Sequence, residues 1–132
     1  MKKITESTSN YDQLEDKTTL ELLEGINAED QTVANAVAKE LSSIESFIDA
    51  AYQKMVKGGR LFYIGAGTSG RLGVVDASEC PPTFGVDHGI VNGIISGGDK
   101  AIRKAVEFAE DNSDLSWTDL MKFSISEHDV VV

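Results

Sequence analysis

A glycine-rich turn carries the first residues whose types and spacing point to chemistry. It reads Gly65-Ala66-Gly67-Thr68-Ser69-Gly70 and follows a short apolar run. A strand-to-helix turn of this kind directs several backbone N–H groups and the positive end of the helix dipole at one point, so it binds an anion. The hydroxyls of Thr68 and Ser69 add two donors, which suits the three free oxygens of a phosphate monoester. We therefore predict that Gly67, Thr68 and Ser69 bind a phosphate group.

Two other interpretations of this turn stay open. The spacing of Gly65, Gly67 and Gly70 also matches the dinucleotide fingerprint, although the next strand ends in Ser96-Gly97-Gly98 and not in an acid placed for a ribose hydroxyl. In the other interpretation, the glycines serve only to let a helix pack closely on a sheet. The turn lacks the last glycine of a nucleophile elbow and the lysine of a P-loop, which excludes the α/β-hydrolase and P-loop NTPase classes.

Acidic residues further along are candidates for acid–base chemistry. Glu79 lies just before Pro81-Pro82. If the diproline ends a helix at Cys80, the Glu79 carboxylate lies near a helix C-terminus, where partial negative charge favours the protonated form of a general acid. An exposed glutamate with no function is the ordinary alternative. Glu107 and Glu110 lie three apart on a predicted helix, and periodicity does not say whether either faces a site.

The segment before the turn is predicted to be helical. We expect a polar arm over residues 1–16 and a helical segment over residues 17–59. Thr18 and Glu21 form a capping-box pattern at the start of the first helix.

A second, longer helix is predicted to begin at Asn27, with Asp30 in its first turn. Apolar residues then recur at steps of three and four as far as Met55, and Lys57-Gly58-Gly59 is typical of a helix end. This helix has more apolar surface than one small sheet needs, which indicates a subunit contact.

Strands and helices alternate in the second half of the chain. The expected elements are a strand at 61–64, a helix at 72–80 ended by the diproline, a strand at 90–95, helices at about 100–109 and 115–121, and a strand at 129–132. This alternation predicts an α/β fold, with a parallel sheet between two layers of helices. The sheet would end at an unpaired third strand. We therefore expect residues 60–132 to be the first part of a larger domain, and the chain to be a piece of a longer protein.

Composition excludes several classes of protein. The formal net charge of −10 repels nucleic acid and anionic lipid, and no uncharged stretch is long enough to span a bilayer. The single cysteine, Cys80, cannot form an internal disulfide, and with two histidines it cannot supply a Cys/His zinc site. The start of the chain lacks the apolar run of a signal peptide. We expect a protein of the reducing cytoplasm without a bound metal.

A resemblance to a known family is carried by the residues around the turn. Residues 59–73, which contain it, and residues 76–85, which contain Asp76-Ala77-Ser78-Glu79-Cys80-Pro81-Pro82-Thr83, resemble the signature of N-acetylmuramic acid 6-phosphate etherases. Shorter similar segments lie on both sides of this signature in the same order, from Ile4-Thr5-Glu6 to Asp129-Val130-Val131-Val132, so the resemblance covers nearly the whole chain. The Thr-Ser-Gly-Arg turn is shared with other sugar isomerase (SIS) domains and with the glucokinase regulatory protein, whereas the diproline segment is far more specific to the etherases.

The resemblance implies a SIS-type, flavodoxin-like fold and a homodimer. It also implies a lyase that removes D-lactate from N-acetylmuramic acid 6-phosphate and leaves N-acetylglucosamine 6-phosphate, with no metal or other cofactor. By position in the motifs, Glu110 corresponds to the base at carbon 2 and Glu79 to the acid that protonates the lactyl oxygen, while Gly67, Thr68 and Ser69 hold the 6-phosphate. We leave Glu107 as structural.

The resemblance also implies that this chain is incomplete, because family members are more than twice as long. A second phosphate-binding loop and a C-terminal helical region are then missing, so we expect the chain alone to have little or no etherase activity. A non-catalytic sugar-phosphate sensor, like the glucokinase regulatory protein, is the alternative function. Such a sensor would use the Thr68-Ser69 turn without needing Glu79.

Overall fold

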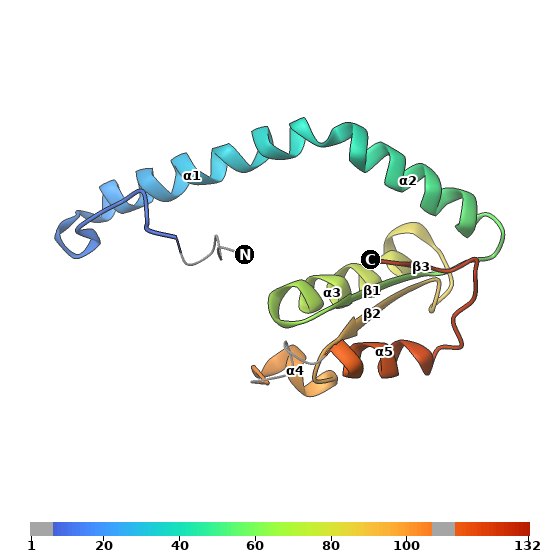
Figure 1. The fold of residues 1–132 in the computed structure, drawn as a ribbon. Coiled ribbons are helices and arrows are strands. Elements are labelled where there is room, and N and C mark those ends of the chain that lie inside the picture. Colours follow the sequence, from blue (N-terminus) through green and yellow to red (C-terminus); the bar gives the residue numbers. More distant parts are fainter. Residues whose placement is uncertain (1–6, 107–112) are drawn as a thin grey trace. The chain divides into compact units, whose positions relative to one another are not determined.

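The computed structural model describes residues 7–106 and 113–132 (Figure 1). In chain order, its elements are η2 (Leu14–Asp16), α1 (Thr19–Lys39), α2 (Leu41–Met55), β1 (Leu61–Gly65), α3 (Gly67–Phe84), β2 (Val91–Ile95), α4 (Asp99–Arg103), α5 (Ser113–Met121) and β3 (Val130–Val131). The chain divides into two compact units, Met1–Glu45 and Ser46–Val132. Each unit is described by itself below.

The first unit is built on α1, and its predicted capping box is confirmed. The Thr18 backbone N–H and hydroxyl each donate to the Glu21 carboxylate at 2.7 Å, and Glu21 N–H donates to the Thr18 hydroxyl at 3.3 Å. The described residues of the polar arm expected before α1 contain some regular structure. They include the short helix η2, and the Tyr11 hydroxyl donates to the Gly25 carbonyl at 3.3 Å, which fastens this segment to α1.

The predicted helix start at Asn27 is wrong, because α1 continues through it. The Asn27 side chain accepts from the Gln31 side chain at 2.7 Å, one turn further on, and so does not cap a new helix. The interruption comes at Glu40, whose φ of −104° and ψ of 7° leave the helical region. The second helix ends at Met55, and Gly58 with φ 88° lies in the turn that follows, as the Lys57-Gly58-Gly59 pattern predicts.

The second unit contains a three-stranded parallel sheet in the order β2-β1-β3. Leu61 pairs with Val91 on one side and with Val130 on the other. All three predicted strands are therefore confirmed. Their apolar runs are short and lie between turn residues, which is typical of strands buried in parallel sheets.

Helices cover both faces of this sheet, as the alternation predicts (Figure 1). On one face α3 packs over β1 and β2. On the other face Phe62, which is fully buried, and Ile94 form the core with Leu120 of α5. The Phe123 ring meets the Phe62 ring edge-on, with the two centroids 5.3 Å apart. The α/β fold with three layers is thus confirmed.

A buried ion pair fixes the amino ends of β1 and β3. The Asp129 carboxylate is 3% exposed and lies 2.8 Å from Nη2 of Arg60. It also accepts from the backbone N–H groups of Arg60 and Ser126, each at 2.8 Å. These contacts hold the pKa of Asp129 well below its usual range, chiefly through the Arg60 side chain.

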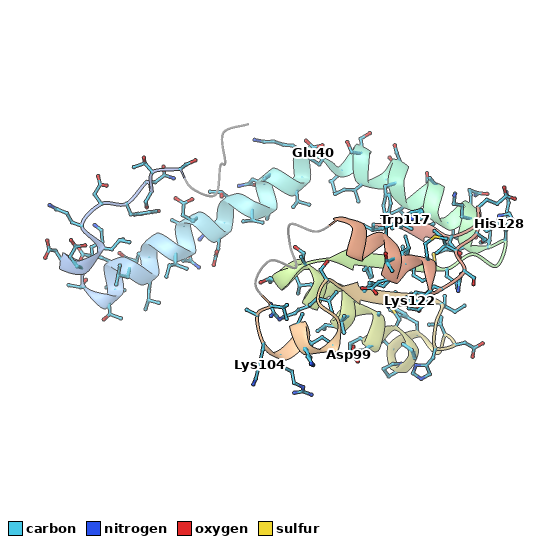
Figure 2. All side chains as sticks on the ribbon, turned by 60° about the horizontal axis from the view of Figure 1, so that its bottom comes forward. Glu40, Asp99, Lys104, Trp117, Lys122 and His128 are labelled. Atoms are coloured by element: carbon cyan, nitrogen blue, oxygen red, sulfur yellow. The ribbon has the colours of Figure 1, made fainter. Side chains whose placement is uncertain are left out.

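The helix expected at residues 100–109 is shorter than predicted. It is α4, which ends at Arg103, and Lys104 is already extended with φ −134° and ψ 135°. Figure 2 labels Asp99 at the start of α4 and Lys104 just after its end. The helix predicted at 115–121 is confirmed as α5, which carries Trp117.

Candidate functional site

The turn between β1 and α3 has the geometry expected of an anion site. Ala66 precedes the helix in an extended conformation, with φ −116° and ψ 164°, and no side chain caps the helix start. Gly67 has φ 52°, in the left-handed region that favours glycine. Because the first acceptor inside the helix, the Ala66 carbonyl, is taken by Gly70 N–H at 3.1 Å, the N–H groups before Gly70 have no partner along the helix. The side chains of Thr68 and Ser69 are exposed beside these donors.

Other glycines of this region serve close packing, which was the competing interpretation of the motif. A Cβ on Gly70 would lie 2.6 Å from the Gly65 carbonyl oxygen, and one on Gly73 would lie 2.6 Å from Cβ of Tyr63. On β2, a Cβ on Gly93 would lie 2.5 Å from Cα of Val74 in α3. Close packing therefore accounts for Gly70 and Gly73. It does not account for the two hydroxyl residues of the turn.

A second turn adjoins the first at the carboxyl end of β2. Gly65 and Ile95 are register partners, and Ser96 N–H donates to the Gly65 carbonyl at 2.9 Å. Gly97 and Gly98 follow with φ of 90° and 68°. Ligands of open parallel sheets bind at this edge, outside the carboxyl ends of the strands.

Arg71 has a function in the fold that the sequence did not reveal. Its Nε donates to the Ile102 carbonyl at 2.9 Å, and its Nη2 donates to the Ala101 carbonyl at 2.7 Å. These carbonyls lie at the C-terminal end of the short helix α4, where the partial negative charge of the helix dipole also attracts a cation. Arg71 therefore joins α3 to α4. The sequence contained no signal for this pairing, because the partners are backbone atoms 30 and 31 residues away.

The prediction that the diproline ends the helix at Cys80 is wrong. Pro81 and Pro82 lie inside α3, which continues to Phe84 and ends at Gly85 with φ 68°. Gly85 N–H donates to the Pro81 carbonyl at 2.9 Å and closes the last turn. Because neither ring carries a backbone N–H, the carbonyls of Ala77 and Ser78, one turn earlier, receive no helical hydrogen bond from these two positions. Glu79 is therefore not a helix-end residue, and the argument for its protonation from the helix terminus fails.

The structure does not bring Glu79 together with the turn of the same chain. Glu79 is exposed and lies ten residues beyond Ser69 on one continuous helix. At 1.5 Å per residue the two Cα atoms are about 15 Å apart along the axis. Glu107 and Glu110 lie outside the described residues.

A cleft beside the turn contains residues that the sequence analysis missed. It has a volume of about 400 Å³ and is lined by Tyr63, Ile64, Ser69, Leu72, Gly73, Asp76 and Val132. Burial and a hydrogen bond with Asp76 raise the pKa of Tyr63 to about 12. Burial, and then the charge of Asp76, raise the pKa of the Cys80 thiol. Ser69 and Asp76 are seven residues apart, which is about two helical turns, so they lie on the same face of a helix. This spacing was the available signal in the sequence that both residues line one cleft.

Within residues 7–106 and 113–132, no group of three or more metal-ligating side chains is close enough to hold a metal ion. None of the helices in this described part is both long and apolar enough to cross a membrane.

Comparison with known proteins finds one family and a set of curated relatives. Residues 41–132 match the family described as the glucokinase regulatory protein N-terminal SIS domain. The N-acetylmuramic acid 6-phosphate etherase of Christiangramia forsetii is 60% identical over 128 residues, which are 97% of this chain and 47% of the relative. The etherase of the same name from Porphyromonas gingivalis is 52% identical over 130 residues, 98% of this chain and 47% of the relative. A third, from Clostridium botulinum, is 51% identical over 93% of this chain and 41% of the relative. The chain thus spans less than half the length of these curated relatives.

Proposed function

Because the chain belongs to the glucokinase regulatory protein N-terminal SIS domain family, we propose that it binds a sugar phosphate and forms the N-terminal part of an N-acetylmuramic acid 6-phosphate etherase. The observation that carries the proposal is the identity of 60% over 97% of the chain with a relative of that name. The turn between β1 and α3 supports it, because free N–H groups and two hydroxyls meet there at the carboxyl edge of the sheet.

The proposed reaction is an elimination followed by addition of water. In the open-chain sugar, the proton on carbon 2 is acidified by the neighbouring aldehyde, and Glu110 removes it. A double bond forms between carbons 2 and 3, the bond from carbon 3 to the lactyl oxygen breaks, and Glu79 protonates that oxygen. Glu79, now a carboxylate, then accepts a proton from the water that adds to carbon 3, and Glu110 returns a proton to carbon 2, which restores both side chains. General acid–base help of this kind is worth roughly 100-fold to 10 000-fold per group.

The phosphate is assigned to the turn and not to a cationic cluster. Thr68 and Ser69 offer their hydroxyls and, with Gly67, the N–H groups of the first helical turn. Arg71 is held by two carbonyls of α4 and contributes only by fixing α3. Glu107 is assigned no chemical role.

The first test compares residues 1–132 with the product of the whole reading frame that encodes them. Both are supplied with N-acetylmuramic acid 6-phosphate, and released D-lactate is measured enzymatically. We expect release by the complete product and little or none by residues 1–132, because the chain covers 47% of its relative. Absence of D-lactate from the complete product would refute the proposal.

A regulatory sugar-phosphate sensor is the second candidate, favoured by the family match over residues 41–132. The substitution Glu79→Gln separates the two functions. An etherase should keep its affinity for N-acetylglucosamine 6-phosphate and lose at least about 100-fold of its turnover, since Glu79 is the proposed acid. A sensor would bind the sugar phosphate equally well with either residue and release no lactate in either form.

The proposal includes a homodimer in the cytoplasm. Large apolar side chains are exposed along α2, among them Phe47 at 46% and Ile48 at 56%. A patch of this kind usually marks an interface. The cytoplasm is proposed because the single cysteine, Cys80, is free, which suits a reducing compartment.

A further inference from the structure

The apolar residues on one side of α1 form a continuous stripe. Leu22, Ile26, Val33 and Val37 follow one another at steps of four, seven and four residues, which puts them on one face of the helix. We call these four residues the α1 stripe. Ile26 and Val33 are each 60% exposed, and no residue of α1 is buried among the described residues. Because burial of an apolar face supplies most of the stability of a helix in a protein, the α1 stripe needs a partner.

One end of the α1 stripe lies in a groove. The segment before α1 turns back along the first turns of the helix (Figure 1), and the groove at this place has a volume of about 330 Å³. Leu22 and Ile26 of the stripe line it, together with Tyr11 and Leu14 from the segment before α1. The exposed apolar surface of the stripe thus continues into a hollow of the first unit.

A glycine inside the helix allows this groove to form. A Cβ on Gly25 would lie 3.1 Å from Cε1 of Tyr11, which is closer than ordinary van der Waals contact. The Tyr11 hydroxyl donates to the carbonyl of the same glycine at 3.3 Å. Glycine in a helix interior is destabilising relative to alanine, so at this position the close approach of Tyr11 outweighs the local helix preference. Tyr11 can therefore form one wall of the groove.

The polar rim of the groove is acidic. Glu21, Glu29 and Asp30 line it, with Lys17 as the one cation among the lining residues. Charges of one sign on a surface favour a partner that carries the opposite sign. The rim therefore favours a partner segment with lysine or arginine beside its apolar residues.

A second copy of α1 does not carry these charges. Lys39, in the last turn, is the one basic residue of the helix. Two copies that met groove to groove would bring acidic residues together, which is unfavourable. A different source of partner is available, because more than half of the Christiangramia forsetii relative lies outside the part that matches this chain.

We propose that the α1 stripe and its groove bind an amphipathic helix with basic flanks, supplied by the part of the same polypeptide that lies outside residues 1–132. A helix fits because the stripe runs for fifteen residues beyond Leu22, about 22 Å, and helices pack on one another along such stripes. The inference rests on the proposed function only where that function makes this chain a piece of a longer protein. It does not depend on the reaction.

Photo-crosslinking identifies the partner in the product of the whole reading frame. The photoreactive amino acid p-benzoylphenylalanine is incorporated in place of Val33, the protein is illuminated, and the cross-linked peptides are identified by mass spectrometry. The matched control has the same amino acid in place of Asn35, which is exposed on the opposite face of α1. We expect cross-links from position 33 to a peptide outside residues 1–132, and at least about tenfold fewer from position 35. Cross-links that join only residues 1–132 to one another, or equal yields at the two positions, would overturn the inference.

Hydrogen–deuterium exchange tests the contact without an introduced probe. In the complete product, Ile26→Asp should speed exchange of the α1 amides at least about tenfold, because burial of the apolar side chain against the partner is lost. Ala28→Asp places the same side chain on the opposite face of the same helix and should change exchange less than about twofold. If Ile26 is as exposed in the complete product as its 60% in residues 1–132, the two variants will behave alike, which contradicts the contact.

A charge reversal tests the basic flanks of the partner. Asp30→Lys, at the rim of the groove, should speed exchange of the α1 amides about fivefold, the upper range for one exposed ion pair. Glu24→Lys makes the same change of charge on the opposite face of α1 and should have no such effect. Equal effects of the two reversals would overturn the assignment of a basic partner. A complete product that shows the expected cross-links but releases no D-lactate would refute the etherase proposal and support this inference.

Discussion

Replacing Asp129 by asparagine tests whether the buried ion pair holds the sheet together. Oδ1 accepts from the Arg60 backbone N–H at 2.8 Å and from its Nε at 3.1 Å, while Oδ2 accepts from Nη2 of Arg60 and from Ser126 N–H, both at 2.8 Å. The amide nitrogen of asparagine cannot accept, so two donors lose their partner and the ion pair loses its negative charge. An unpaired buried donor costs about 1–3 kcal/mol, and breaking a buried pair costs about 3–5 kcal/mol.

The exposure of the two side chains favours a cost near the lower end of the 3–5 kcal/mol range for a broken buried pair. The Asp129 carboxylate is 3% exposed, but the Arg60 side chain is 29% exposed and can recover part of its hydration. We therefore expect Asp129→Asn to lower the free energy of unfolding by about 3 kcal/mol at pH 7. Urea unfolding followed by the fluorescence of Trp117, the one tryptophan of the sequence, measures this difference.

The pH dependence has a definite sign. The pKa of Asp129 is lowered in the folded protein, so its contribution is complete above the pKa of an unfolded aspartate, near 4, and is lost as the pH falls further. The stability gap between wild type and Asp129→Asn should thus stay constant from pH 7 to about pH 5 and narrow below about pH 4. The control is Asp119→Asn, because Asp119 pairs at 2.7 Å with Lys122, whose side chain is 68% exposed. Its removal should cost less than about 1 kcal/mol. Equal losses for the two variants, or a gap that does not narrow in acid, would refute the reasoning.

Three other substitutions probe the site. Arg71→Lys should lower the free energy of unfolding by about 1–2 kcal/mol, measured by urea unfolding, because a lysine cannot reproduce the two parallel bonds to α4. Asp76→Asn should lower the Tyr63 pKa from about 12 toward 10, because the negative charge of Asp76 is lost while burial, the larger cause, remains; an ultraviolet titration measures this, and an unchanged titration contradicts the contribution of Asp76. Gly67→Ala, at φ 52°, should weaken binding of N-acetylglucosamine 6-phosphate to the complete product roughly tenfold in calorimetry, because the left-handed conformation that binding requires at this position then costs about 1–2 kcal/mol and the free turn relaxes away from it. Gly58→Ala, at φ 88° in a remote turn, carries the same kind of strain and should leave that affinity unchanged.

The sheet was predictable because its signals are local. The apolar runs of β1 and β2 are bounded by glycines, and the alternation with helices leaves few arrangements other than a parallel sheet. The helix boundaries were less predictable, because they depend on competition between neighbours. Asn27 could cap a helix or pair with Gln31 within one, and the structure has the second arrangement. The diproline could end α3 at Cys80, but Gly85 offers a better end five residues later.

In the candidate site, too, local features could be predicted from the sequence and contacts between distant residues could not. The strand-to-helix turn was predictable because its glycines are adjacent in the sequence, whereas binding of phosphate by Thr68 and Ser69 stays a prediction. The pairing of Tyr63 with Asp76 was not predictable, because it depends on how α3 lies across β1, and neither was the binding of Arg71 to α4. The error at the diproline had the largest consequence. A helix ending at Cys80 made Glu79 a terminal residue, whereas the continuous helix leaves it exposed far from the turn.

The acidic composition and the proposed phosphate site are compatible because they act over different distances. A net charge of −10 acts on the approach of an anion and is screened beyond roughly 10 Å at moderate salt. The N–H groups at the start of α3 act only on an anion in contact with them, where their partial charges are aimed at one point. Arg71, the cation next to the turn in the sequence, is engaged with α4. Selectivity then follows from this arrangement. A polyanion such as nucleic acid is repelled along its whole length by the acidic surface. A single sugar phosphate carries one phosphate group, so the repulsion is smaller, and that group can accept hydrogen bonds from the N–H groups and hydroxyls at the start of α3.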